Sequence, residues 1–278
     1  MTIREALRLA AARLEQAGVP DADVDAAYLL ASVLKEDTLA MRINGHRELA
    51  APQRAAFDAL CDRRAAREPL QYILGETEFM GLTFHVEPGV LIPRADTETL
   101  VEKALEWMKP GARVLDIGTG SGAIAVSLAK LGRQAQVTAA DVSDRALEIA
   151  RQNAERNGAA VEFVKSDCFS ALKGRKYDMI VSNPPYISED EMRGLMPEVT
   201  REPELALFGG ADGLDFYRRI SREAPEYLNE GGCLLFEIGW LQKDAVSALV
   251  KAHIGEPFAL RDYGQNWRVV GARKEGAC

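Results

Sequence analysis

Asn-Pro-Pro-Tyr at 183–186 combines residue types that could hold a planar nitrogen nucleophile. An amide nitrogen is a poor nucleophile because its lone pair is delocalised into the neighbouring carbonyl group. Two hydrogen-bond acceptors aimed at its two hydrogens would fix its orientation and favour the positive charge that develops on nitrogen during the reaction. The side-chain carbonyl of Asn183 and the backbone carbonyl of Pro184 are suited to these tasks. We therefore predict that Asn183 and Pro184 are catalytic.

The other residues of this motif would shape the acceptor site. Pro184 and Pro185 each have a fixed φ and no N–H, which stiffens the loop. Tyr186 offers an aromatic face to a flat group and is large enough to exclude water. We predict that Asn183, Pro184, Pro185 and Tyr186 bind the substrate. The alternative is a proline-stiffened loop without a chemical role.

A glycine-rich segment, VLDIGTGSGAIAVSLA, places Gly118, Gly120 and Gly122 between an apolar run and a helical pattern. Glycine at such a turn lets the backbone approach a ligand closely and enter the helix tightly. Asp141 ends the next apolar run, nineteen residues after Gly122. A carboxylate there could accept hydrogen bonds from both hydroxyls of a ribose. Together these residues predict a cofactor that contains adenosine.

The spacing of the glycines separates two such cofactors. Nicotinamide dinucleotides bind to G-x-G-x-x-G, where the helix N-terminus holds a pyrophosphate. Here the spacing is G-x-G-x-G, and the preceding Asp116 would repel a pyrophosphate. The same carboxylate could pair with the amino group of S-adenosylmethionine, which has no phosphate. The pattern favours S-adenosylmethionine, while a dinucleotide and a purely structural turn are the alternatives.

A third apolar run ends at Asp167, which could receive the adenine amino group, and Cys168 and Phe169 could pack on the adenine ring. Ligands of open α/β sheets bind beyond the carboxyl ends of the strands. We therefore expect these residues, the glycine-rich turn and the Asn-Pro-Pro-Tyr motif at one edge of a sheet. The predicted cofactor-binding residues are Gly118, Thr119, Gly120, Ser121, Gly122, Asp141, Asp167, Cys168 and Asn183.

The elements that must position these residues alternate from residue 97 onward. Helices are predicted at 97–108, 121–131, 144–157, 213–228 and 241–253, and strands at 113–118, 136–141, 161–167, 177–186, 233–239, 257–262 and 267–273. This alternation predicts an α/β fold with a mostly parallel sheet covered on both faces. The last two strands, which DYGQN joins, should form an antiparallel hairpin.

The N-terminal part has a different pattern. Thr2 and Glu5 form a capping box, and apolar residues recur at helical spacing after them. Further helices are predicted at 21–34, 37–44, 51–66 and 69–74, and a hairpin at 78–86 around Gly81. We predict an all-helical domain at 1–75, a hairpin and linker at 76–96, and an α/β domain at 97–278.

Composition excludes several other classes of protein. The net charge of −8 argues against broad binding to nucleic-acid phosphates. The four cysteines and three histidines are scattered without metal-ligand spacing, so we expect no metal. No apolar stretch has the roughly 18 residues of a membrane helix, and the N-terminus lacks the features of a secretory signal. We therefore expect a soluble, cytoplasmic protein that does not bind membranes.

The chain resembles the HemK/PrmC family of release factor glutamine N5-methyltransferases. The resemblance covers nearly the whole chain and rests on DIGTGSG, Asp141, SNPPYI, the N-terminal helices, and the segments QYILG (71–75), IPRADTE (92–98) and EPELALFGGADGLDFYRRI (202–220). It implies the Rossmann-like fold of class I S-adenosylmethionine-dependent methyltransferases, with a seven-stranded sheet. It also implies an enzyme that methylates the side-chain amide nitrogen of the glutamine in the GGQ motif of class 1 peptide chain release factors.

The resemblance assigns roles by position. Gly118 to Gly122, Asp141, Cys168 and Asn183 would contact S-adenosylmethionine, Asn183 to Tyr186 would hold the glutamine, and the domain at 1–75 would bind the release factor. Two positions depart from the family pattern, since Ala95 stands where a proline is usual and Cys168 where an aromatic residue is common.

Some choices stay open at the level of sequence. An N-methyltransferase that acts on an exocyclic base amine of nucleic acid would use the same chemistry, but it should carry a basic stripe. A nicotinamide-dependent oxidoreductase and an inactive binding module are further alternatives. We expect Glu202, Asp212 and Asp215 to be solvated helix caps. Three residues near the linker could border the cofactor entrance: Arg94, Asp96 and Glu98.

Overall fold

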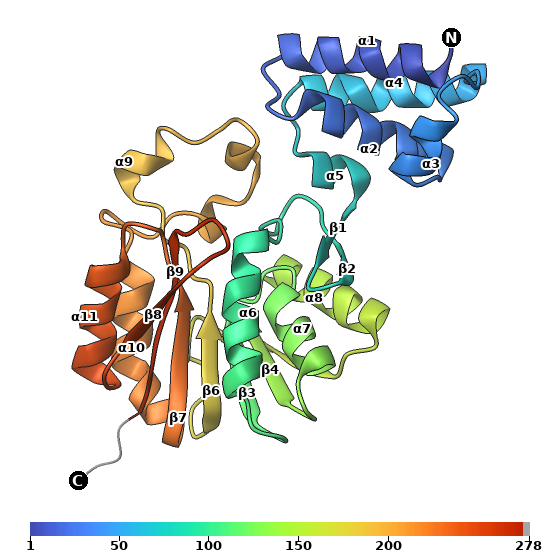
Figure 1. Ribbon diagram of the computed structural model, residues 1–278. Coiled ribbons are helices and arrows are strands. Elements are labelled where there is room, and N and C mark those ends of the chain that lie inside the picture. The colour runs from blue at the N-terminus through green and yellow to red at the C-terminus, as the bar shows by residue number, and fades with distance from the viewer. Residues whose placement is uncertain (275–278) are drawn as a thin grey trace. The chain divides into compact units, whose positions relative to one another are not determined.

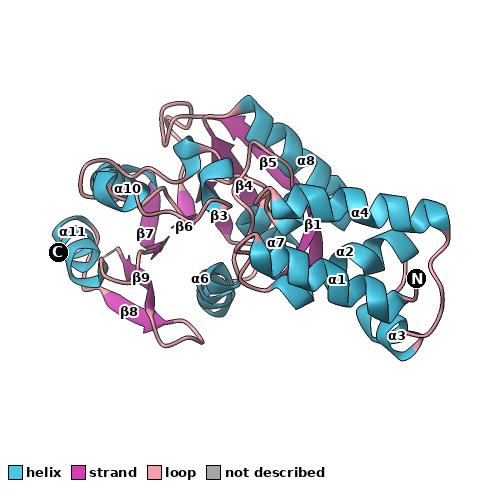
Figure 2. Ribbon diagram, turned by 90° about the horizontal axis from the view of Figure 1, so that it is seen from above, coloured by secondary structure: helices cyan, strands magenta, loops and turns pink. Residues whose placement is uncertain are grey.

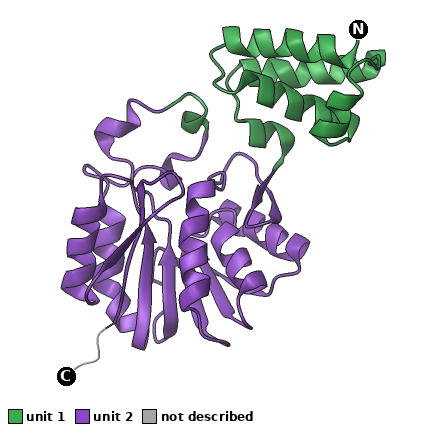
Figure 3. Ribbon diagram, viewed as in Figure 1, with its two compact units in different colours: residues 1–76, 196–201 green, residues 77–195, 202–278 purple. Residues whose placement is uncertain are grey.

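The computed structural model describes residues 1–274, so Cys278 lies outside the described part of the chain. Two compact units divide it (Figure 3). The helical unit contains residues 1–76 and 196–201, and the sheet unit contains the described residues of 77–195 and 202–278. In the part of the chain that the structure describes, no helix is both long and apolar enough to cross a membrane.

A seven-stranded sheet in the order β5-β4-β3-β6-β7-β9-β8 forms the centre of the sheet unit (Figure 1). All pairings from β5 to β7 are parallel, and β9 pairs antiparallel with both β7 and β8. The α/β prediction and the terminal antiparallel hairpin are therefore confirmed. The strands are β3 (Arg113–Ile117), β4 (Gln136–Asp141), β5 (Val161–Lys165), β6 (Tyr177–Ser182), β7 (Leu228–Glu237), β8 (Phe258–Arg261) and β9 (Trp267–Arg273).

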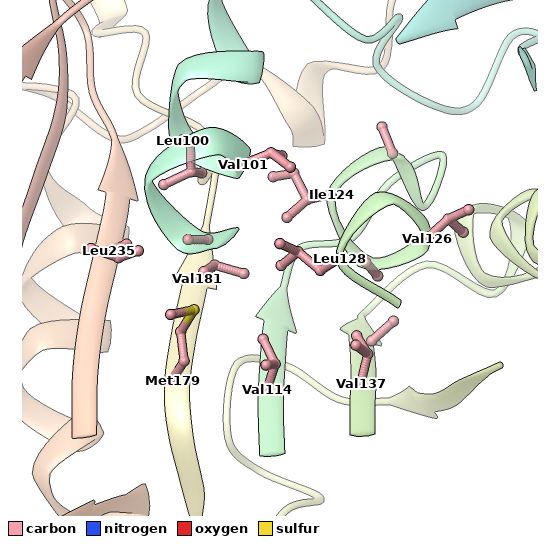
Figure 4. Packing of buried hydrophobic residues seen from close by; sticks show 14 of the residues in the cluster. Leu100, Val101, Val114, Ile124, Val126, Leu128, Val137, Met179, Val181 and Leu235 are labelled. Carbon is pink, nitrogen blue, oxygen red and sulfur yellow. The ribbon is translucent and has the colours of Figure 1, made fainter. Parts of the chain in front are cut away.

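Both faces of this sheet are covered by helices, because successive side chains of a strand point to opposite faces. Val114 of β3 and Val181 of β6 pack against α6 and α7 (Figure 4). Leu115 and Ile180 pack on the other face, which α10 and α11 cover (Figure 2). The helices are α6 (Ala95–Trp107), α7 (Ala123–Leu131), α8 (Asp144–Asn157), α10 (Asp215–Tyr227) and α11 (Lys243–His253).

A short hairpin precedes this sheet. Its strands are β1 (Glu76–Phe79) and β2 (Leu82–His85), and the two residues between them, Met80 and Gly81, both have positive φ (51° and 71°), as a type I′ turn requires. Fully buried Asn153 of α8 accepts a hydrogen bond from the His85 N–H (2.7 Å) and donates to the His85 carbonyl (2.9 Å) and to the Ser121 carbonyl (2.8 Å). One side chain thus fixes both β2 and the glycine-rich turn to α8.

The helical unit consists of α1 (Ile3–Gln16), α2 (Ala22–Leu34), α3 (Thr38–Ile43), α4 (Ala51–Ala65) and α5 (Leu70–Leu74). The predicted capping box is confirmed: the Thr2 N–H donates to Glu5 Oε2 at 2.8 Å and the Glu5 N–H donates to Thr2 Oγ1 at 3.3 Å. Ile3, Leu14 and Phe57 are buried at its centre.

Residues 196–201 belong to this unit although they lie far away in sequence. Arg64 Nη1 donates to Glu198 Oε1 at 2.8 Å, and Arg67 donates to both oxygens of the same carboxylate at 2.6 and 2.7 Å. Arg64 Nε also donates to Asp25 Oδ2 at 2.7 Å. One acidic side chain from a distant segment therefore completes the hydrogen bonding of two arginines.

Candidate active site

A pocket lies where four parallel strands of the sheet unit end. The residues that follow or end these strands contribute to its wall: Gly118 and Gly120 after β3, Asp141 at the end of β4, Asp167 and Cys168 after β5, and Asn183, Pro184 and Pro185 after β6. Apolar side chains of Val90, Leu91, Leu205, Phe216 and Ile220 close the remainder. The structure therefore brings the glycine-rich turn and most of the Asn-Pro-Pro-Tyr motif to one pocket, as strand order requires.

The glycines of the turn have two different structural roles. Gly118 and Gly120 have positive φ (73° and 54°), and a Cβ on either would meet no atom within 4 Å. Gly122 also has positive φ, but a Cβ there would lie 3.0 Å from the Cβ of Ala150 in α8. Gly118 and Gly120 therefore leave the pocket side of the turn open, while Gly122 permits close packing of two helices. Gly122 does not line the pocket.

Two hydroxyl residues of the turn face inward. Thr119 and Ser121 are buried and do not line the pocket. Thr119 Oγ1 donates to Asp116 Oδ2 at 2.7 Å. Asp116 itself is fully buried, and its second oxygen, Oδ1, has no hydrogen-bond partner. Burial raises the pKa of Asp116 to about 7, so a cation held beside the turn would stabilise its charged form.

Asp141 lies at the pocket with both carboxylate oxygens oriented by the backbone. Oδ2 accepts from the Gly120 N–H and Oδ1 from the Ser143 N–H, each at 2.9 Å. Burial raises its pKa, and these two bonds oppose that shift. A carboxylate has about four lone-pair sites, so each oxygen can still accept a hydrogen bond from a ligand hydroxyl.

The residues after β5 differ in character. Asp167 is exposed, and its Oδ1 accepts from Arg219 Nη1 at 2.6 Å. Cys168 is buried with a positive φ of 48°, and burial raises the pKa of its thiol to about 11, so the thiol is neutral at physiological pH. The structure does not bring Phe169 to the pocket, because its ring stacks on Tyr227 with centroids 4.3 Å apart. The wall of the pocket therefore presents a small apolar side chain here.

The side chain of Asn183 is oriented by a hydrogen bond to a residue of α6. Asn183 Nδ2 lies 3.4 Å from Thr97 Oγ1 and donates to it. Thr97 belongs to α6 and is buried, and Glu237 at the end of β7 is also buried. The hydrogen bond to Thr97 turns the NH2 group of Asn183 toward the protein interior. The carbonyl oxygen of Asn183 is therefore the acceptor that is available to a ligand.

Glycines of the segment 209–213 allow the backbone of the Asn-Pro-Pro-Tyr motif to pack closely. A Cβ on Gly209 would lie 2.6 Å from the carbonyl oxygen of Pro185, and one on Gly213 would lie 2.3 Å from that of Tyr186. Gln242 Nε2 donates to the same Tyr186 carbonyl at 2.9 Å. Neither Gln242 nor a packing role for these glycines was predicted from the sequence.

Tyr186 borders a second, neighbouring groove rather than the pocket itself. This groove is lined by Tyr186, Ile187, Glu191, Leu195, Gly239, Trp240, Leu241 and Gln242. Trp240 and Leu241 are largely exposed, at 57% and 72%. An exposed apolar surface therefore continues from the motif toward solvent.

Several charged residues occupy places other than those expected. Glu202 is buried, not a solvated cap: its Oε2 accepts from the Ile92 N–H at 3.0 Å and its Oε1 pairs with Arg94. Of the linker residues, Asp96 pairs with Arg268 and Glu98 accepts from the Met80 N–H. Neither they nor Arg94 line the pocket.

Asp212 and Asp215 are exposed and both pair with Arg218, which agrees with the expectation of solvated caps. Asp212 Oδ1 also accepts from the Leu214 N–H at 3.2 Å, just before α10 begins.

Comparison with known proteins gives this pocket a context. Residues 82–201 match the family model described as Methyltransferase small domain, and residues 5–75 match the PrmC N-terminal domain. A protein named release factor glutamine methyltransferase, from Geobacter sulfurreducens, is 46% identical over 274 residues, which is 98% of this chain and 96% of that protein. The chain belongs to the release factor glutamine methyltransferase family. A second relative of that name, from Cereibacter sphaeroides, is 44% identical, with 100% of both chains covered.

Solved structures agree with this assignment at the level of the fold. A methyltransferase from Pyrococcus furiosus superposes with a TM-score of 0.56 at 24% identity over 71% of this chain and 91% of that one. A methyltransferase solved in complex with SAH gives a TM-score of 0.51 at 14% identity over 82% and 68%. The class I methyltransferase fold and the family resemblance are therefore confirmed.

The departure from the family pattern at Ala95 has a simple structural setting. Ala95 is the first residue of α6. Proline is accepted at that position because its missing N–H would have no partner within the helix. Alanine has a high helix propensity and is equally compatible with this position.

Proposed function

We propose that this chain transfers a methyl group from S-adenosylmethionine to the side-chain amide nitrogen, N5, of the glutamine in the GGQ motif of class 1 peptide chain release factors. The observation that carries the proposal is that Gly118, Asp141, Asn183 and Pro184 line one pocket. A nucleoside cofactor held by the first two residues and an amide held by the last two would meet there. The names of the relatives support the choice of acceptor.

The residues of the pocket suit S-adenosylmethionine, which supplies an electrophilic methyl group on a sulfonium when it is bound. Asp141, with its oxygens held by two backbone N–H groups, would accept from the ribose hydroxyls. The buried and unpartnered oxygen of Asp116 favours a cation near the turn. The neutral thiol of Cys168 offers an apolar surface for adenine, and the exposed Asp167 would receive its amino group.

The acceptor amide would be held by oxygen atoms alone. Asn183 Oδ1 and the Pro184 carbonyl would each accept one N–H of the glutamine, since Asn183 Nδ2 is directed to Thr97. Both oxygens carry partial negative charge, which favours the positive charge that grows on nitrogen. Pro185 would complete the wall of the pocket, and Tyr186 would contact the substrate from the neighbouring groove. The proton would leave after transfer, so no general base is required.

The partner would be a folded protein. We propose that residues 1–75 bind the release factor, residues 76–96 link the domains, and residues 97–278 carry out catalysis. Exposed large apolar side chains on the helical unit, namely Leu9, Val24, Tyr28, Leu39 and Ile43, support a protein-binding role. The reaction would take place in the cytoplasm, where release factors act, with no metal.

Incubation of the protein with S-adenosylmethionine labelled in its methyl group tests the proposal. A purified release factor should become labelled, and a release factor with the GGQ glutamine replaced by alanine should not. Parallel reactions with transfer RNA and with DNA test the alternative acceptor, an exocyclic base amine. Labelled nucleic acid together with an unlabelled release factor would refute the proposed function.

A further inference from the structure

Glu237 is the last residue of β7, lies in the sequence Phe-Glu-Ile-Gly and is 1% exposed. A glutamate is almost never fully buried unless it has a partner. Glu237 Oε2 nevertheless has no hydrogen-bond partner. Arg268, a cation that acts on the charge of Glu237, is itself bound to Asp262 Oδ2 (3.0 Å) and Asp96 Oδ2 (2.9 Å). The sheet unit therefore keeps a carboxylate in its interior without a direct ion pair.

Glu237 lies beside the start of the acceptor loop, because Ser182 of β6 and Phe236 of β7 are partners in parallel register and Asn183 and Glu237 are the residues that follow them. The side chains of Thr97 and Asn183 both act on the Glu237 carboxylate as hydrogen-bond donors that favour its charged form. The backbone of Glu237 is fixed as well, because the Tyr217 hydroxyl donates to its carbonyl oxygen at 2.8 Å. Glu237 thus has a defined place next to Asn183 but no access to the pocket.

An ionised carboxylate can only accept hydrogen bonds. If the Thr97 O–H donates toward Glu237, the Thr97 oxygen is left to accept from Asn183 Nδ2 at 3.4 Å. Asn183 then has a single orientation, with its NH2 group inward and its carbonyl oxygen outward. If Glu237 were protonated or replaced by an amide, it could donate instead, and the carboxamide of Asn183 could turn over.

We propose that Glu237 is a positioning residue that fixes the direction of the Thr97–Asn183 hydrogen-bond chain and so presents the carbonyl oxygen of Asn183 to the acceptor NH2 group. This inference rests on the proposed function, since it assigns Asn183 Oδ1 to the acceptor. It adds a residue that touches neither cofactor nor substrate.

The ionisation of Glu237 should make the orientation of Asn183 depend on pH. Burial, with a smaller contribution from Asp96, outweighs the opposing effects of Thr97, Arg268 and Asn183 and raises the pKa of Glu237 to about 7. The other titratable groups that face it are Tyr186 and Tyr217, and burial raises the pKa of each. Turnover should therefore increase as pH rises through the neutral range, because only the ionised form orients Asn183.

The test compares Glu237→Gln with Glu230→Gln, a matched control on the exposed part of the same strand. With saturating cofactor, Glu237→Gln should lower kcat about 10- to 100-fold, as loss of an orienting partner does, and remove the rise of kcat with pH. The dissociation constant for cofactor and the KM for release factor should change less than about threefold. Glu230→Gln should match the wild type.

A second pair of variants covers the case in which Glu237→Gln does not fold. Thr97→Ser keeps the hydroxyl and should keep kcat, whereas the isosteric Thr97→Val should lose it about tenfold or more. Equal turnover in both Thr97 variants, or an unchanged pH profile in Glu237→Gln, would overturn the proposal.

A substrate-independent measurement separates this inference from the proposed function. The side-chain NH2 resonance of Asn183, assigned by its loss in Asn183→Asp, should shift with pH near neutrality in the wild type and not in Glu237→Gln. If the wild type methylates no release factor, the proposed function fails, and this resonance still decides the role of Glu237. A resonance that does not respond to pH in the wild type contradicts that role.

Discussion

Glu198 offers the most quantitative test of how the helical unit holds its distant segment. Its side chain is 13% exposed, and its partners Arg64 and Arg67 are 6% and 20% exposed. Burial raises the pKa of Glu198, but hydrogen bonds from Arg67 and Arg64 outweigh this and lower it from its ordinary 4.5 to about 2. At about 1.4 kcal/mol for each pKa unit, the charged form contributes about 3 kcal/mol.

The perturbation is Glu198→Gln, which keeps the shape of the side chain and removes its charge. We expect the free energy of opening of residues 196–201 to fall by about 2–3 kcal/mol, because poorly solvated Arg67 loses its counter-charge and buried Arg64 keeps only Asp25. The Arg201 N–H, which donates to the Glu198 carbonyl at 3.1 Å, should then exchange its hydrogen about 30- to 150-fold faster.

Amide hydrogen exchange followed by mass spectrometry measures this directly. The matched control is Glu148→Gln, since Glu148 forms an exposed pair with Arg145 that should be worth less than about 1 kcal/mol. In the wild type the protection should be complete above pH 4.5 and disappear as pH falls toward 2, because the folded-state pKa is lowered. Exchange at 196–201 that is unaffected by Glu198→Gln would refute this reasoning.

Three further predictions concern the pocket and the loop around it. Asp141→Ala should weaken binding of S-adenosylmethionine by about 1.5–3 kcal/mol through loss of charged hydrogen bonds to ribose, and an unchanged dissociation constant in calorimetry would count against that role. Asn183→Ala should lose most turnover while cofactor affinity stays within a few fold; an equal loss of both would contradict the assignment of Asn183 to the acceptor. Gly213→Ala should lower both turnover and the melting temperature, because its Cβ would lie 2.3 Å from the Tyr186 carbonyl oxygen. Its control is Gly231→Ala, which has a similar φ (69°) and open space around the Cβ, so equal effects of the two variants would show that only backbone strain matters.

The regular part of the fold follows from local patterns. The helix predicted at 144–157 and the strand predicted at 136–141 have the same bounds in the structure. These elements have clear sequence patterns, because the helix buries one face and the strand buries a continuous apolar run. The candidate pocket was also predictable, because parallel strands carry the residues after them to a common edge.

The segment between β6 and α10 could not be predicted in the same way. It contains α9 (Glu189–Met192) and two 3-10 turns (Val199–Arg201 and Glu204–Ala206), none of which the sequence analysis expected. Polar residues and prolines give this segment no apolar period, and its contacts are distant in sequence: Glu198 is 134 residues from Arg64. Glu202 was misjudged for the same reason, since its partners lie 108 and 110 residues away.

Thr97 and Gln242 were not predicted as part of the site, because nothing in their local sequence distinguishes them from other residues of a helix or of the segment before one. Thr97 is an ordinary helix residue by its pattern, and Gln242 precedes a helix without any motif. Glu237 could have been noticed in the sequence, because it is a lone glutamate within the apolar run CLLFEIG. This run forms a strand that is buried on both faces. A charge at such a position costs several kcal/mol unless it is compensated, and that cost is a reason to look for a role.

The proposed geometry has Asn183 and Pro184 holding an acceptor NH2 group in front of the cofactor methyl. A crystal structure of this protein with S-adenosylhomocysteine and a release factor would measure this geometry. We expect Asn183 Oδ1 and the Pro184 carbonyl oxygen each to lie about 3 Å from the side-chain nitrogen of the GGQ glutamine, with that nitrogen facing the cofactor sulfur. A glutamine bound elsewhere, or an Asn183 that turns its NH2 group toward that nitrogen, would show that the proposed acceptor site is wrong.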